Sequence, residues 1–347
     1  MPRERFWTEL LFDRLPVDRD RISHQVVARF ALLLLVWLSG LLVYGVEGLA
    51  GEYLSNYQLL STLFGNGLIV LFGTHMIQQS LPEAISSFSE LVDLDEGSFR
   101  RLSDRIEGLS FSFVPCLVIG LFYTLLLTDA PAEAQRLLAE GPTAHSLWNL
   151  AFVSFAYLLT GTGIWMGVSI WLTVLIISRQ PLRVELSPGL IERFRGLSML
   201  TLWFALFYFL AISIGIATSV VGGSAVSMAE MLLSPFLLFI ALGIACVLLP
   251  FYNIHRALVG LKLRELREIE GEYETLRLQL EEASRGDASD AIAAMGRLFS
   301  LQIRERRLRE APEWPVDVGF VSRLVSVVLI PAVVRISVEL FNRLYVK

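Results

Sequence analysis

Seven long apolar stretches run through this 347-residue chain, and a long charged segment separates the last of them from the other six. They cover residues 30–46, 59–77, 109–127, 148–178, 197–221, 232–252 and 318–334. A helix of about 20 apolar residues crosses the hydrocarbon core of a bilayer, which is about 30 Å thick. The pattern therefore predicts an all-α, polytopic integral membrane protein with seven transmembrane helices.

Arginine and lysine indicate the orientation, because they are enriched in connections on the cytoplasmic side. The leader and the connections after the second, fourth and sixth stretches are rich in arginine, whereas the alternate connections contain almost none. This pattern places the N-terminus inside and the C-terminus outside. Arg335, Arg343 and Lys347 would then lie outside, against the bias. A six-helix arrangement, in which residues 318–334 lie along the inner membrane surface, therefore stays open.

Composition divides the chain into four parts. They are a cytoplasmic amphipathic leader (1–26), a six-helix transmembrane domain (27–256), a cytoplasmic helical hairpin that serves oligomerisation (257–313) and a C-terminal transmembrane helix (314–347). In the leader, Phe6, Trp7, Leu10 and Leu11 have helical spacing and are expected to face lipid at the inner interface.

The hairpin is predicted from a heptad seam followed by a turn and a second helical arm. The seam consists of Leu266, Ile269, Tyr273, Leu276, Leu280 and Ala283, spaced alternately three and four residues apart. The first arm is rich in glutamate and the second in arginine, so the two arms complement each other when folded back. We expect copies of the chain to associate through this hairpin and the last transmembrane helix.

The last apolar stretch carries a small and polar stripe. Gly319, Ser322, Arg323, Ser326, Ile330, Val333, Ser337 and Phe341 fall on one face of a helix, which is small and polar near its cytoplasmic end and apolar in the middle. In one interpretation the stripe lines a water-filled path, with Ile330 and Val333 as the gate. In the other it packs against neighbouring helices, and Arg323 extends to the inner interface. Trp314, between two prolines, is expected to anchor the re-entry of the chain at the interface.

Signals for catalysis are weak, and we predict that the protein is not an enzyme. The histidines are scattered, no pair of them has metal-ligand spacing, and no catalytic residue, metal or cofactor is assigned. His75 is either a proton site or an ordinary interfacial histidine. The small residues 160–163 (TGTG) are interpreted as a close helix contact, and the two cysteines as buried thiols.

Seven spans with an inside N-terminus, a cytoplasmic helical extension before the last span and a polar-striped last span resemble the seven-transmembrane ion channels typified by insect odorant and gustatory receptors. The resemblance implies a homotetramer, with the hairpins as a central anchor, the last span lining the pore and a ligand pocket among the other spans. Residues 328–332 (VLIPA) do not match the short aromatic signature that the insect families carry there. No functional residue is transferred from the family.

The sequence thus predicts an oligomeric ion channel or channel-like chemoreceptor of the plasma membrane. Its expected partners are the lipid bilayer, further copies of the chain and a small-molecule ligand, but not nucleic acid. Two alternatives stay open. One is a secondary transporter or lipid-handling protein, which buried intramembrane acids would favour. The other is a sensor that signals through the hairpin to a soluble partner.

Overall fold

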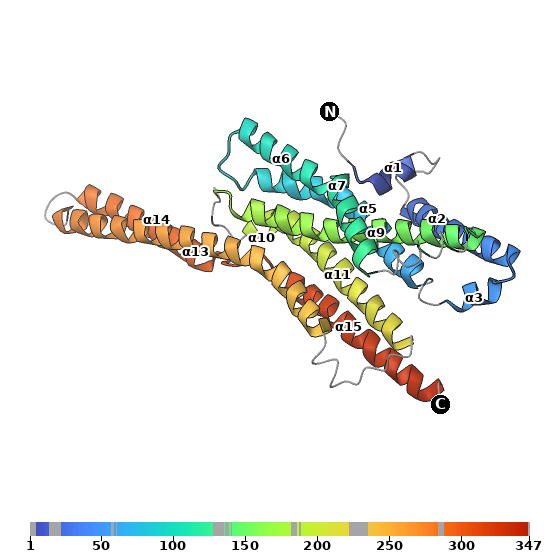
Figure 1. The fold of residues 1–347 in the computed structure, drawn as a ribbon. Helices are drawn as coiled ribbons and strands as arrows, with labels where there is room; N and C mark the ends of the chain where they lie inside the picture. The colour runs from blue at the N-terminus through green and yellow to red at the C-terminus, as the bar shows by residue number, and fades with distance from the viewer. Residues whose placement is uncertain are drawn as a thin grey trace.

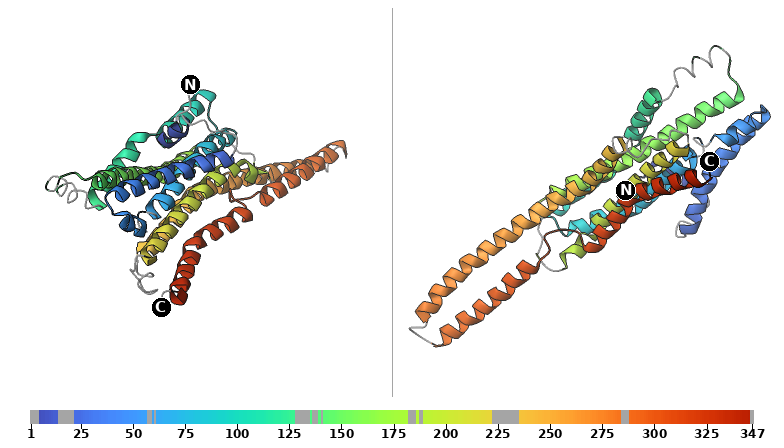
Figure 2. Two further views of the ribbon diagram at one scale, coloured as in Figure 1. Left: turned by 90° about the vertical axis from the view of Figure 1, so that its right-hand side faces the viewer. Right: turned by 90° about the horizontal axis from the view of Figure 1, so that it is seen from below.

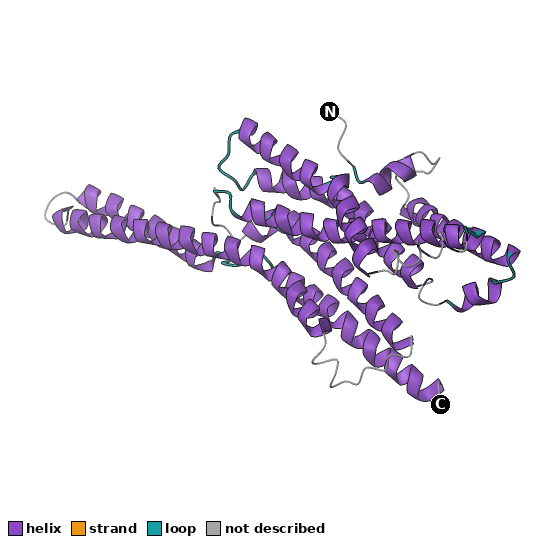
Figure 3. Cartoon of the chain, viewed as in Figure 1, coloured by secondary structure: helices purple, strands orange, loops and turns teal. Residues whose placement is uncertain are grey.

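The computed structural model describes residues 5–13, 22–56, 59, 61–127, 135, 139, 141–181, 186, 189–221, 235–283 and 288–345. Over these residues the protein is helical and contains no β-strand, as predicted (Figure 3). Six helical segments in the described part are long and apolar enough to cross a membrane: His24–Val46, Glu96–Phe122, Ala144–Ser178, Arg195–Ala217, Leu238–Glu281 and Val318–Val338. A membrane protein is the architecture that these segments support.

The six segments differ from both predicted arrangements. The last stretch, which the six-helix alternative laid along the membrane, is one of the six. The second stretch, 59–77, is not among them, because it forms a short π-helix, η1 (Ser61–Asn66), and the first part of a more polar helix, α5 (Gly67–Ser89). Thr74, His75 and Gln78 interrupt the apolar pattern of α5. A seventh span therefore remains a proposal.

Helix α5 lies inside the bundle and contacts most of the other membrane helices. It packs against α2 (Ile22–Val46), α9 (Ala144–Ser178) and α11 (Arg195–Val221). Helix α7 (Phe113–Leu127) packs on α9, and α15 (Val318–Tyr345) packs on α11 (Figure 1). Short helices α3 (Ala50–Ser55) and α10 (Leu190–Arg193) lie in the connections, and α6 (Glu96–Ser110) precedes α7 within the candidate segment Glu96–Phe122.

Helix starts follow from local side-chain hydrogen bonds. Thr143 caps the 35-residue helix α9: its hydroxyl accepts a hydrogen bond from the backbone N–H of Ser146, and the Ser146 hydroxyl accepts one from the Thr143 N–H. Asp95 caps α6 by accepting from the Ser98 N–H at 3.0 Å. These two caps fix where α6 and α9 begin.

The crossing of α7 and α9 depends on glycine. A Cβ atom placed on Gly161 would lie 2.6 Å from the backbone nitrogen of Gly120 and 2.9 Å from its Cα. Backbone atoms cannot move aside as a flexible side chain can, so only glycine allows this approach. The interpretation of residues 160–163 as a close helix contact is therefore confirmed at Gly161.

Beyond the bundle, α13 (Pro235–Ala283) continues as one 49-residue helix, and α14 (Ala288–Glu310) folds back along it (Figure 1). The seam residues Ile269 and Leu276 are buried between the two arms, where α14 contributes Ala294, Leu301 and Leu308. The heptad seam of α13 is thus occupied by α14 of the same chain. It is not free to join another copy.

The segment between α14 and α15, residues 311–317, packs against α13, and we call this segment the elbow. The Lys262 ammonium donates to the backbone oxygens of Arg309 and Ala311 at 3.0 and 3.1 Å, and so satisfies carbonyls at the end of α14. His255 stacks on Trp314 with ring centroids 4.2 Å apart. Trp314 is 44% exposed. The role of Trp314 as an anchor at the membrane interface stays a prediction.

Candidate functional site

The structure places the predicted stripe on the open side of α15. Ser322, Arg323, Ser326, Val333 and Ser337 are exposed, whereas Gly319 and Ile330 are partly buried. The opposite side of the helix packs into the bundle through Phe320, Leu324 and Pro331, and Phe320 meets the ring of Phe251 at 5.4 Å. Among the exposed members, Arg323 contacts Met199 of α11, with its Nη1 4.0 Å from the sulfur, and the other four are open in the described part of the chain.

A third side of α15 is uniformly apolar. Val321, Val325, Leu329, Ala332, Ile336 and Leu340 are all exposed and recur every three or four residues. Since each residue advances a helix by about 100°, this side and the polar stripe are separate faces flanking the packed side. The apolar face suits acyl chains. The polar stripe does not, because serine and arginine are disfavoured in hydrocarbon.

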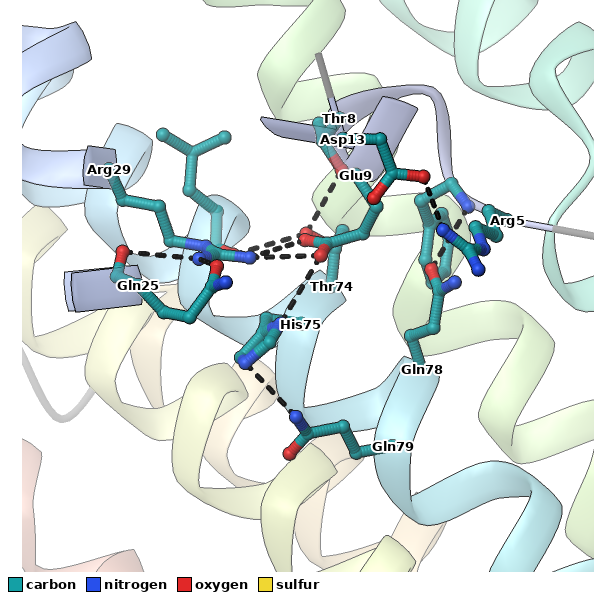
Figure 4. Close-up of polar contacts among 12 residues, drawn as sticks. Arg5, Thr8, Glu9, Asp13, Gln25, Arg29, Thr74, His75, Gln78 and Gln79 are labelled. Carbon is teal, nitrogen blue, oxygen red and sulfur yellow. Dashed lines mark hydrogen bonds and ion pairs between the residues drawn. The ribbon is translucent and has the colours of Figure 1, made fainter. Parts of the chain in front are cut away.

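The structure also reveals a polar cluster around the N-terminal helix α1 (Trp7–Asp13), which lies against α5. Glu9 of α1, Arg29 of α2 and His75 of α5 meet there (Figure 4). The Arg29 guanidinium donates from Nη2 to both Glu9 carboxylate oxygens, at 2.8 and 2.9 Å. His75 Nδ1 donates to the second Glu9 oxygen at 3.2 Å.

Arg29 is fully buried and all its donor groups are occupied. Its Nε donates to the backbone oxygen of Leu71 at 3.0 Å, and its Nη1 to the side chain and backbone of Gln25 at 2.6 and 3.1 Å. The Phe12 ring lies 4.6 Å from the guanidinium carbon and adds a cation–π contact. The geometry thus compensates the arginine charge with one carboxylate, three oxygen acceptors and one ring.

Glu9 is charged in this setting. Burial raises the pKa of Glu9, but the hydrogen bond from His75 and the charge of Arg29 outweigh burial and hold the pKa below its ordinary value. His75 Nε2 lies 3.2 Å from the Gln79 amide nitrogen, so both ring nitrogens of His75 have hydrogen-bond partners. The cluster therefore contains one buried ion pair, Glu9–Arg29, with the imidazole ring of His75 beside it.

We expect the stabilisation from Glu9 to depend on pH in one direction. Because the pKa of Glu9 is lowered in the folded protein, its contribution is complete above the ordinary glutamate value of 4.5 and is lost as the pH falls through the folded value. The difference in thermal unfolding midpoint between wild type and Glu9→Gln should be constant from neutral pH down to the ordinary glutamate value of 4.5 and shrink as the pH falls further. A difference that grows on acidification would contradict the charged pair.

A cavity of about 190 Å³ lies beside the cluster. Its polar lining comes from Arg5, Glu9, Asp13, Gln25, His75, Gln78, Gln79 and Glu107, and its apolar lining includes Phe12 and Phe111. Arg5 and Asp13 form a further ion pair at its edge. Water or a small polar solute can therefore approach Glu9 and His75 from one side.

The leader differs from its predicted orientation. Leu10 and Leu11 are exposed as expected, but Phe6 is 1% exposed and packs edge-on against Phe111 at 5.0 Å, so its predicted lipid contact is wrong. Trp7 is partly buried, and its indole N–H donates to the Thr162 hydroxyl at 2.9 Å. Helix α1 therefore presents Glu9 and its buried neighbour Thr8 to the bundle, and leucines to the outside.

Sequence reasoning identified His75 as a candidate proton site but missed Glu9 and Arg29. Both lie in or beside charged segments that look exposed in sequence, and their pairing joins residues 20 positions apart across two helices. The available signal was the position of Arg29 at the edge of the first apolar stretch, where a charge needs a partner.

Comparison of the chain with protein-family models, with curated proteins and with solved structures finds no match in any of the three.

Proposed function

We propose that the protein is an oligomeric membrane channel in which α15 helices of several copies line a shared path. The observation that carries the proposal is the division of α15 into three faces. One packs on α11, one is apolar and suited to lipid, and the third is small and polar and mostly exposed on its own chain. Further copies around a water-filled axis would satisfy that third face.

Along the path, the residue types set the expected behaviour. Ser322 and Ser326 offer hydroxyls to water or an ion, and Arg323 places a positive charge near the cytoplasmic end in the predicted orientation. Ile330 and Val333 form the apolar part of the stripe, where a narrow path would lose water and close. The proposal therefore keeps Ile330 and Val333 as the gate.

The test uses single cysteines in liposome flux or planar-bilayer recordings. Ser326→Cys and Ser322→Cys proteins should react with membrane-impermeant thiol reagents and lose most of their current, because the attached group obstructs the path. Val325→Cys and Leu329→Cys are matched controls on the apolar face and should keep their current. Equal behaviour of the two faces, or unreactive serine positions, would contradict the pore assignment.

The buried Glu9 favours a second candidate function, a secondary transporter. An acid inside the bundle, next to a histidine and an open polar cavity, is a feature that proton-linked transport uses. In that case solute flux should respond to a proton gradient, be lost in His75→Ala and be unaffected by modification at Ser326→Cys. Flux that ignores the proton gradient, persists in His75→Ala and is blocked by modification at Ser326→Cys supports the channel.

A further inference from the structure

The second arm of the hairpin carries an apolar face that its own chain does not cover. Ile292, Met295, Phe299 and Ile303 of α14 are 41–72% exposed. Their spacing of three, four and four residues places them on one side of the helix. We refer to these four residues as the outer stripe of α14.

The outer stripe lies opposite the side that packs on α13. The buried residues Ala294, Leu301 and Leu308 face α13, and Ala294 follows Ile292 by two residues, which advances a helix by about 200°. The first arm can therefore cover only one of the two apolar sides of α14. An exposed row of large apolar side chains on an otherwise charged helix is typical of an interaction surface.

Lipid is a poor occupant for this surface. At 1.5 Å per residue, the outer stripe stands roughly 12 to 28 Å from Ala311, where the elbow begins. The hairpin continues the direction of α13 away from the bundle, as Figure 1 shows. With Trp314 at the membrane interface, as the sequence predicts, the outer stripe lies in water beyond the membrane surface, where only a protein can cover it.

Charge on α14 does not demand an acidic partner. Arg306 pairs with Glu310 at 2.9 Å, Arg309 with Glu305 at 2.7 Å, and Arg304 with Glu272 of α13 at 3.6 Å. Because these pairs form within one chain, three of the α14 arginines are compensated before the arms of two copies lie side by side in parallel. Copies in one bilayer also share orientation and a high effective concentration.

We infer that the outer stripe of α14 binds the same stripe of a second copy, in parallel, about a symmetry axis along the membrane normal. This inference rests on the proposed assembly of several copies and names the surface that joins them outside the membrane. Equivalent residues then face each other across the axis, as in an isologous interface. Since α15 continues from the base of α14, the same contact would bring α15 helices of neighbouring copies together (Figure 2).

Disulfide trapping of the full-length protein in nanodiscs tests the inference. Met295→Cys and Phe299→Cys should form covalent dimers on mild oxidation, because each cysteine faces its own counterpart. Ser300→Cys and Arg297→Cys are exposed controls on another side of α14 and should cross-link several-fold less. The wild type, with Cys116 buried and Cys246 partly buried, supplies the baseline. Equal cross-linking at all four positions, or cross-links to another protein, would overturn the inference.

A second variant separates loss of the contact from loss of the fold. Met295→Asp/Phe299→Asp should lower the subunit count in native mass spectrometry while helix content stays that of wild type, because neither residue packs on α13. Leu301→Asp should instead unfold the hairpin, since Leu301 is buried in the seam. A wild-type subunit count in the double variant contradicts the inference and leaves the channel standing. Trapped dimers without ion flux contradict the channel and leave the inference standing.

Discussion

Replacing Glu9 with leucine is expected to lower the free energy of unfolding by about 3 kcal/mol and to release α1 from the bundle. The carboxylate receives both donors of the Arg29 Nη2 group and a hydrogen bond from His75, and Arg29 is fully buried. Removing it leaves a guanidinium without its counter-charge. The cost falls at the lower end of that for broken buried pairs, because release of α1 lets water reach Arg29.

The double variant Glu9→Leu/Arg29→Leu should recover most of the loss, because no charge is then left without its partner. Asp13→Asn is the matched control: it removes a carboxylate of the same helix, from the partly exposed pair with Arg5, and should cost at most about 1 kcal/mol. Chemical unfolding in detergent measures the stabilities, and protease sensitivity of the leader reports α1 release. Equal losses for Glu9→Leu and Asp13→Asn would contradict the role of the buried pair.

Gly161→Leu is expected to cost about 3 kcal/mol and to separate α7 from α9. Its Cβ alone would lie within 2.6 Å of the Gly120 nitrogen, and the clash involves backbone on both helices. Repacking of side chains cannot relieve such a contact. The protein should lose yield in detergent, and its thermal midpoint should fall sharply.

Gly45→Leu in α2 serves as the control for adding a large side chain to a membrane helix. A Cβ on Gly45 meets no atom within 4 Å, so this substitution should leave the midpoint close to that of wild type. A double-cysteine cross-link between α7 and α9 would report their separation directly. Similar midpoints for Gly161→Leu and wild type would show that the helices do not cross as closely as described.

Much of the fold is predictable from the sequence because the membrane imposes a simple rule on helix length and composition. The long helix α9 and the close contact at Gly161 follow from an uninterrupted apolar run and from small residues. Residues 59–77 pass the same rule in the sequence but are not among the six candidate segments of the structure. Apolar length alone does not distinguish a lipid-facing span from a helix such as α5, whose faces are buried by protein.

The candidate sites were predictable to different degrees. The stripe on α15 is a local property of one helix, so helical spacing alone identifies it. Its exposure depends on α11 packing against the other side, which spacing does not reveal. The Glu9–Arg29 pair depends on how the leader folds onto the bundle. The leader's pattern fits either orientation for Phe6, and the burial of Phe6 against Phe111 decides it.

A map of the protein in nanodiscs by electron microscopy tests the central claim most directly. The account predicts several copies around one axis, with α15 of each copy nearest the axis and Ser326 directed toward it. The apolar face that includes Val325 and Leu329 should point to lipid. A map in which acyl chains surround every uncovered side of α15 would contradict the channel.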